Sequence, residues 1–415
     1  MKVWILIFVC MFSMPLLVAV LHFRMRKGQI LKIRQDYVKN ARYFGRSFSA
    51  LVEKALPEMK NGMIMLSRQE KVLETDGKQE FVQPEIEDLI IARNTIFCPQ
   101  QEDLHFQKEI YSEKDALFVK ENIRLRAVYS KKRLLFGNKI RLLRWADAEH
   151  AVAVYDECDL GERVSSGEQL VIGFENVFHS LYAPVIRLGQ RPEEPDRFME
   201  ERDPRIFRMP VMNSHEYNRH YIDDDMVTEG GTVPYTIISR GDIKVIEDII
   251  LQGDIHSDGA VRIMENASVL GNIFAENDIL LEKNATVLGN IFTQGNIIFE
   301  EGASAGQPHK IISVVARGTI TFYGGNYVYG YVVSEGGGKI LKSDREVLGE
   351  YCFPGEPVHE EKITFRDLSE YENVDFQGFR GDIYVKEAII PEGASVIPKS
   401  QFFECRSLEK VYLPE

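Results

Sequence analysis

The sequence predicts a mainly β protein: a single-stranded triangular β-helix with 18-residue coils, preceded by a transmembrane helix and a membrane-proximal helix. The nonapeptide NASVLGNIF at 266–274 recurs as NATVLGNIF at 284–292, 18 residues later. Within each copy, pairs of apolar residues spaced by two begin every six residues, which is typical of short strands separated by corners. A repeat of this length is typical of solenoids. Residues 3–23 carry no formal charge, which predicts the membrane helix.

Residues 1–23 are the predicted anchor. The apolar run is long enough to cross the hydrocarbon core, and Pro15 within it is tolerated in membrane helices. A cleaved signal peptide is the alternative, but it would have a shorter apolar core and a small-residue cleavage site.

The flank after the anchor is basic, whereas only Lys2 precedes it. Its cationic residues are Arg24, Arg26, Lys27, Lys32 and Arg34. The positive-inside rule therefore predicts a single-pass protein with its N-terminus outside and its body in the cytoplasm. The same residues should be attracted to anionic headgroups.

Residues 24–105 are predicted to form a basic membrane-proximal helix and a linker. An apolar seam with three- and four-residue spacing runs through Ile30, Ile33, Tyr37, Ala41, Phe44, Phe48, Leu51 and Ala55. Two interpretations stay open, a helix packed on its own domain and a coiled coil that dimerises the chain. The helix should end at Leu56, because the residue before a proline disfavours the helical region.

Residues 106–350 are the predicted solenoid. The 18-residue period is clear around 241–299, and a weaker version runs from about 116 to 188. The segment at about 189–234 is rich in charge and proline, and we expect it to leave the solenoid wall as an insertion. Gly, Asn and Asp near the predicted corners suit the positive φ angles of sharp turns.

Outward positions of the regular coils are apolar as well. Ile279 is predicted to point inward, between Val261 and Ile297. The predicted outward residues that form a self-association or cover surface are Phe274, Leu280, Phe292 and Ile298. Their cover is either the rest of the chain or a second copy of the protein.

The rows GNIFAENDILLEKNATVL and GNIFTQGNIIFEEGASA resemble the bactofilins, polymer-forming cytoskeletal proteins of bacteria. The resemblance implies a right-handed β-helix that assembles end to end without nucleotide. The segment IPEGASVIPKSQFFECRSLEKVYLPE resembles a leucine-rich repeat of the BspA type. Residues 351–415 are therefore expected to form a C-terminal β cap containing one such unit.

Several binding chemistries are disfavoured by the sequence. A net charge of −13 argues against nucleic acid, and five scattered cysteines contain no metal-binding pair. EGGGK at 335–339 lacks the spacing of a phosphate-binding loop, so we expect a turn there and no nucleotide. A metal at Asp223, Asp224, Asp225, His215 and His220, and a sugar stacked on Tyr327, Tyr329 and Tyr331, are hypotheses weaker than a solvated loop and a packed aromatic patch. We expect no metal and no cofactor.

An enzyme is the alternative function. Left-handed β-helix acyltransferases also use 18-residue coils, with an aliphatic residue before a small one at every sixth position. Leu270-Gly271 and Leu288-Gly289 follow that rule, but Glu276 and Glu282 break it. Only His256, with His309 just beyond, could supply a base in the regular coils.

The expected function is a non-catalytic scaffold anchored in the bacterial inner membrane. It would self-associate or position proteins of cell-envelope biogenesis. A solenoid enzyme acting on envelope polysaccharide, an acyltransferase or a lyase, remains the alternative, and no catalytic residue is predicted.

Overall fold

The structure is a computed structural model. It describes Met14 and residues 40–99, 103–192, 198, 202–209, 211, 216–218, 221–222, 228, 231–308, 310–342, 362–364, 386–394 and 408–414. Apart from Met14, the predicted anchor and the basic flank lie outside the described residues. Among those that are described, no helix is both long enough and apolar enough to cross a membrane. The chain divides into two units, residues 1–44 and 45–415, and the stacked strands belong to the second.

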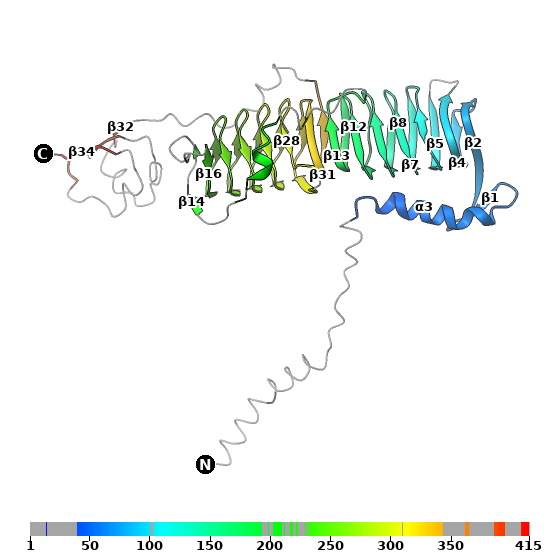
Figure 1. Ribbon diagram of the computed structural model, residues 1–415, viewed down its shortest axis with the longest axis horizontal. Coiled ribbons are helices and arrows are strands. Elements are labelled where there is room, and N and C mark those ends of the chain that lie inside the picture. Colours follow the sequence, from blue (N-terminus) through cyan, green and yellow to red (C-terminus); the bar gives the residue numbers. More distant parts are fainter. Residues whose placement is uncertain are drawn as a thin grey trace, which may run out of the picture. The chain divides into compact units, whose positions relative to one another are not determined.

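Stacked strands form most of this second unit, which confirms the predicted mainly β solenoid (Figure 1). We call residues 69–188 arm one and residues 216–340 arm two. The strands of arm one are β2 (Gln69–Phe81), β3 (Glu85–Ile86), β4 (Leu89–Pro99), β5 (Leu104–Ser112), β6 (Ala116–Phe118), β7 (Ile123–Ser130), β8 (Arg133–Phe136), β9 (Arg141–Ala148), β10 (Ala151–Val154), β11 (Arg163–Ser166), β12 (Gln169–Ile172) and β13 (Asn176–Leu188). The strands of arm two are β14 (Glu216–Asn218), β15 (Tyr221–Ile222), β16 (Thr232–Val233), β17 (Thr236–Ser239), β18 (Ile243–Val245), β19 (Ile250–Leu251), β20 (Ile255–Ser257), β21 (Val261–Ile263), β22 (Ser268–Val269), β23 (Ile273–Ala275), β24 (Ile279–Leu281), β25 (Thr286–Val287), β26 (Ile291–Thr293), β27 (Ile297–Phe299), β28 (Ser304–Ala305), β29 (Ile312–Ala316), β30 (Ile320–Phe322) and β31 (Asn326–Ile340).

Arm two has the coil that the sequence predicts. Each coil contributes three strands, and each strand pairs in parallel with its copies in the adjacent coils, as β23 does with β20 and β26. We call the three faces wall A (β17, β20, β23, β26, β29), wall B (β18, β21, β24, β27, β30) and wall C (β16, β19, β22, β25, β28). Ile279 is fully buried and pairs with Val261 and Ile297, as predicted.

The corners of arm two use glycine and asparagine for two different reasons. Asn284 has a φ of 58°, the left-handed conformation predicted for a sharp corner. Gly271 and Gly289 have no positive φ. A Cβ there would lie 2.3 and 2.2 Å from a carbonyl oxygen of the preceding coil, so close backbone approach requires glycine.

Arm one begins earlier than predicted. β2 already pairs with β4 from Val72 to Pro99, so the stack starts near residue 69 rather than 106, inside the segment predicted as a linker. The coil length there varies, because Val72 pairs with Leu89 but Ile90 pairs with Ile110. Irregular spacing hides a repeat from a search at a fixed period.

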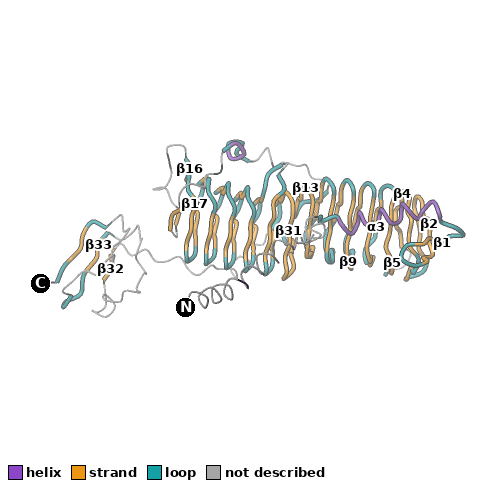
Figure 2. Tube along the Cα trace, turned by 90° about the horizontal axis from the view of Figure 1, so that it is seen from below, coloured by secondary structure: helices purple, strands orange, loops and turns teal. Residues whose placement is uncertain are grey.

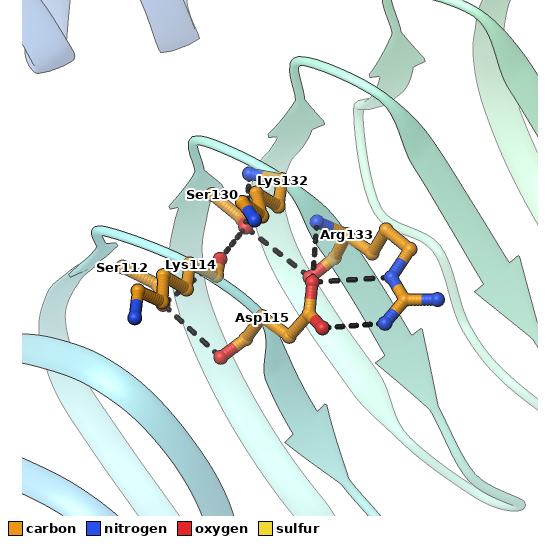
Figure 3. Close-up of polar contacts among 6 residues, drawn as sticks. All are labelled: Ser112, Lys114, Asp115, Ser130, Lys132 and Arg133. Atoms are coloured by element: carbon orange, nitrogen blue, oxygen red, sulfur yellow. Dashed lines mark hydrogen bonds and ion pairs between the residues drawn. The ribbon is translucent and has the colours of Figure 1, made fainter.

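A serine hydroxyl closes the same corner in both arms. In arm one, Ser130 Oγ donates to the carbonyl oxygens of Lys114, one coil earlier, and Arg133 (Figure 3). In arm two, Ser257 Oγ donates to the carbonyl oxygens at the matching positions, Gly241 and Ala260. In each corner the hydroxyl thus supplies a donor to a backbone carbonyl of the preceding coil, that of Lys114 or Gly241.

The two arms meet at their last strands. β13 and β31 pair antiparallel, whereas strands within each arm pair in parallel, and Figure 1 shows the two labels side by side. Leu181 pairs with Val332 in this junction. The glycines at 336–338, predicted as a turn, belong to β31, and a Cβ at Gly338 would lie 2.2 Å from the ring of Phe178. The absence of a side chain at Gly338 therefore leaves room for the Phe178 ring, which lies over the backbone of β31.

A helix covers one face of arm one. α3 (Tyr43–Ala55) is followed by the 3₁₀ turn η1 (Leu56–Glu58) and by β1 (Met63–Met65), which pairs antiparallel with β2. The helix ends before Pro57, as predicted, and lies lengthwise across the strands of arm one (Figure 2). Its buried residues are Gly45, Ser49 and Val52, one position away from the predicted seam, because a side chain at Gly45 would collide with Asp147.

The contacts of α3 favour packing on its own domain over a coiled coil. Val52 is fully buried in a cluster with Tyr111, Tyr129 and Trp145. Phe48 packs edge-on against Trp145, with ring centroids 5.7 Å apart. The predicted seam residue Leu51 instead faces solvent and is 56% exposed.

The insertion leaves the solenoid after β13, and its last part forms the first coil of arm two. β14 and β15 pair in parallel with β17 and β18, so part of the predicted insertion belongs to the stack. In between, η2 (Ile206–Arg208) lies against wall C, where Ile206 contacts Ile250, Leu270 and Leu288. The insertion therefore covers a wall instead of projecting from it.

Three further strands form a separate parallel sheet: β32 (Lys362–Thr364), β33 (Glu387–Ile389) and β34 (Lys410–Tyr412). Ala388 pairs with Val411, which are 23 residues apart, as the leucine-rich-repeat resemblance implies. A cap over the end of the solenoid stays a prediction.

Candidate interaction surface

The four predicted surface residues lie on two different walls. Phe274 and Phe292 are on wall A, whereas Leu280 and Ile298 are on wall B. Leu280 and Ile298 are only 7% and 3% exposed, because Tyr323 packs on them together with the partly buried Leu341. The chain itself therefore covers Leu280 and Ile298, and these two residues are unavailable to a second copy.

Wall A of arm two carries a stack of aromatic rings in a shallow groove of about 380 Å³. His256 stacks on Phe274 with centroids 4.9 Å apart, and Phe274 stacks on Phe292 at 5.4 Å. Phe274 is 37% exposed. We call this surface, together with its charged rim, the open groove.

The rim of the open groove is acidic. It contains Asp258, Glu276, Glu335 and one cation, Arg317, which lies 3.9 Å from Glu335. These groups are exposed, and a surface pair such as Arg317–Glu335 contributes at most about 1 kcal/mol to stability. The groove therefore combines an apolar floor with excess negative charge, an arrangement suited to a cationic, partly apolar partner.

Two of the three tyrosines considered for sugar stacking are buried, and the third packs against another tyrosine. Tyr327 and Tyr329 are buried beneath Phe198 of the insertion, with ring centroids 5.0 and 5.2 Å away. Tyr331 contacts Tyr182 across the junction, at 4.6 Å. The predicted aromatic patch packed under the insertion is confirmed for Tyr327 and Tyr329, whereas Tyr331 is partly exposed and packs at the junction instead.

The remaining candidate residues are only partly described. His215, His220, Asp223, Asp224, Asp225 and His309 lie outside the described residues. Over the described ranges, no group of three or more His, Cys, Asp or Glu side chains could hold a metal ion. Cys158 is buried, and burial raises the pKa of its thiol to about 12, so it is a poor nucleophile.

Sequence reasoning missed the docking site of α3. The helix contacts Tyr111, Tyr129 and Trp145, which lie where the strands pair at 18-residue spacing, although the starts of the same strands pair at spacings of 19 and 17. Lys131 Nζ lies 2.9 Å from Glu53 Oε1 of the helix, and this hydrogen bond lowers the pKa of Glu53. The aromatic residues at strand ends just before Ser112 and Ser130 were the available signal.

Comparison of the chain with protein-family models, with curated proteins and with solved structures finds no match.

Proposed function

We propose that the protein is a non-catalytic scaffold of the bacterial inner membrane that positions a protein of the cell-envelope machinery. Residues 3–23 would anchor it, with the solenoid on the cytoplasmic side. The open groove would be the surface that holds the partner. The single observation that carries this proposal is the aromatic floor of that groove, where Phe274 is 37% exposed, since apolar side chains gathered in a groove with a polar rim are typical of interaction sites.

The junction favours positioning a partner over end-to-end polymerisation. In a solenoid, the open strand edges at the two ends are the surfaces for head-to-tail growth. Here β13 and β31 are the last strands of the two arms, and they pair with each other, so the C-terminal edge of each arm is already paired. The bactofilin resemblance therefore supports the scaffold more than the filament.

Complementation of a deletion strain tests the proposal. Phe274→Asp should fail to restore the phenotype while the solenoid stays folded, with its melting temperature lowered by only a few degrees, because the ring is 37% exposed although it stacks on His256 and Phe292. Leu143→Asp is the matched control, since Leu143 is a similarly exposed apolar residue of arm one. Full activity of Phe274→Asp would refute the proposal. Loss of function in a folded His256→Ala protein with an active Phe274→Asp would support the enzyme instead.

A further inference from the structure

Wall A of arm two corresponds to the face of arm one that α3 covers. In both arms this face carries the residue immediately before the corner hydroxyl, Tyr129 before Ser130 and His256 before Ser257. Counted in coils from the junction, Tyr111 and Tyr129 correspond to His256 and Phe274.

The corresponding rings have the same arrangement. Tyr111 and Tyr129 stack with centroids 5.8 Å apart and planes 18° apart, and His256 and Phe274 stack at 4.9 Å and 15°. In arm one these rings lie beneath α3, in the cluster that contains Val52. Among the described residues, no helix lies on the rings of arm two.

A helix along a solenoid wall matches the spacing of the coils. Neighbouring coils are about 4.8 Å apart, and one turn of α-helix advances about 5.4 Å, so successive turns meet successive coils over three or four turns. Phe48 and Val52 of α3, one turn apart, use this match in arm one. The same backbone spacing is present under the open groove.

The ring stack is a poor platform for a sugar. The face of Phe274 is covered by His256 on one side and by Phe292 on the other, with interplanar angles of 15° and 8°. Mainly ring edges are left for a ligand. Edges pack well against branched aliphatic side chains, whereas pyranose recognition needs an open ring face.

The rim determines the charge of the occupant. In arm one, Lys131 follows the corner next to Tyr129 and binds Glu53 of the helix. The corresponding residue of arm two, next to Phe274, is Glu276. A helix docked there meets a carboxylate where α3 meets an ammonium, so its flank must be cationic.

We propose that the open groove docks an amphipathic α-helix of another protein, with an apolar stripe flanked by lysine or arginine. This inference rests on the proposed function, since it names the class of partner that the scaffold holds.

A charge-swap experiment on the full-length chain tests it. The probe is a labelled synthetic peptide of about 15 residues with leucine at helical i, i+3, i+4 and i+7 spacing and lysine flanks, and its matched control carries glutamate flanks. Fluorescence anisotropy should show binding of the lysine peptide, and circular dichroism should show added helix. Phe274→Asp should weaken binding at least about tenfold, and Leu143→Asp should leave it unchanged. Glu276→Lys should weaken binding of the lysine peptide and strengthen binding of the glutamate peptide.

Three outcomes would overturn the inference. These are no binding of the lysine peptide, binding that Phe274→Asp leaves intact, or a charge preference that Glu276→Lys does not move. Concentration-dependent dimerisation that Phe274→Asp abolishes and the peptide cannot inhibit would assign the groove to a second copy. In each case the scaffold proposal stands if Phe274→Asp fails to complement, and it falls only if that variant is fully active.

Discussion

Arm one carries its aromatic column beneath a helix, whereas arm two leaves the corresponding column in contact with solvent. The serine corner recurs in both arms, and the coils that carry the two columns pair at the same 18-residue spacing, so the difference lies in the outward side chains and in what precedes each arm along the chain. Arm one is preceded by α3, which packs on it. The comparison indicates that the inward residues of a solenoid determine its fold, and the outward residues determine which walls become surfaces.

The junction relates the arms by an approximate two-fold axis. Leu181 and Val332 lie at equivalent positions, each two residues before a corner residue, and they pair with each other. Tyr182 pairs with Tyr331, and at the corresponding positions Ser180 pairs with Val333. Such self-complementary pairing is the geometry of a symmetric dimer interface. Here it occurs inside one chain.

The largest expected effect comes from placing a charge in the core of either arm. Leu134 of β8 in arm one and Ile279 of wall B in arm two are equivalent inward residues, and both are at most 1% exposed. Leu134→Asp and Ile279→Asp should each cost about 3–5 kcal/mol, because the carboxylate is buried without a partner. Chemical denaturation followed by circular dichroism measures the loss. Arg124→Asp is the control in arm one, since that side chain is exposed.

Next in size is the loss of the junction. Gly338→Val places a side chain where the Phe178 ring lies, and should cost about 1–3 kcal/mol. The arms should then unfold in two calorimetric transitions, whereas wild type should unfold in one. Lys339→Val, at an exposed position of the same strand, should keep the single transition. One unchanged transition in Gly338→Val would show that the arms are not coupled through this strand pair.

The parts that the sequence predicts well are those with a constant period. Ile279 is predicted inward because its copies at Val261 and Ile297 are spaced by 18, and the structure confirms it. The start of arm one escapes prediction because the spacing changes there, from 17 between Val72 and Leu89 to 20 between Ile90 and Ile110. The antiparallel junction leaves no local signal, since β13 and β31 are far apart in the chain.

Only half of the candidate surface is predictable, for a related reason. Phe274 and Phe292 point outward, as predicted, and are exposed and partly exposed, respectively. Leu280 and Ile298 are outward but covered by Tyr323, which lies beyond the regular repeats. Periodicity assigns a side chain to a face of a strand, but it carries no information on which distant segment packs over that face.

A smaller effect should distinguish the face of arm one beneath α3 from the open groove of arm two. Val52→Ala should destabilise the docked helix by about 2 kcal/mol, because two buried methyl groups are removed from a fully buried site. Hydrogen exchange of α3 should accelerate while exchange in β20–β27 of arm two stays unchanged. Leu51→Ala, on the exposed side of the same helix, should change exchange little. Faster exchange in both arms would contradict an effect confined to arm one.

The smallest expected effects are opposite responses to pH at one carboxylate in each arm. The hydrogen bond from Arg133 lowers the pKa of Asp115 in arm one (Figure 3). The stabilisation from ionised Asp115 is therefore present above its unfolded pKa, about 4, and is lost as the pH falls through the folded pKa.

Burial, and then the nearby Glu282 carboxylate, raise the pKa of Glu300 in arm two. Stability from Glu300 is therefore present below the unfolded pKa and is lost as the pH rises through the folded value. Asp115→Asn should lower the melting temperature at pH 7 and match wild type at acidic pH, where both side chains are neutral. Glu300→Gln should raise the melting temperature at pH 7 and also converge with wild type at acidic pH. Scanning calorimetry from about pH 3.5 to 7.5 measures the difference in stability between each variant and wild type. For Asp115→Asn this difference should stay below about 1 kcal/mol, because the partner Arg133 is exposed. If the change in melting temperature at pH 7 had the same sign in both variants, the burial of Glu300 would not govern its ionisation.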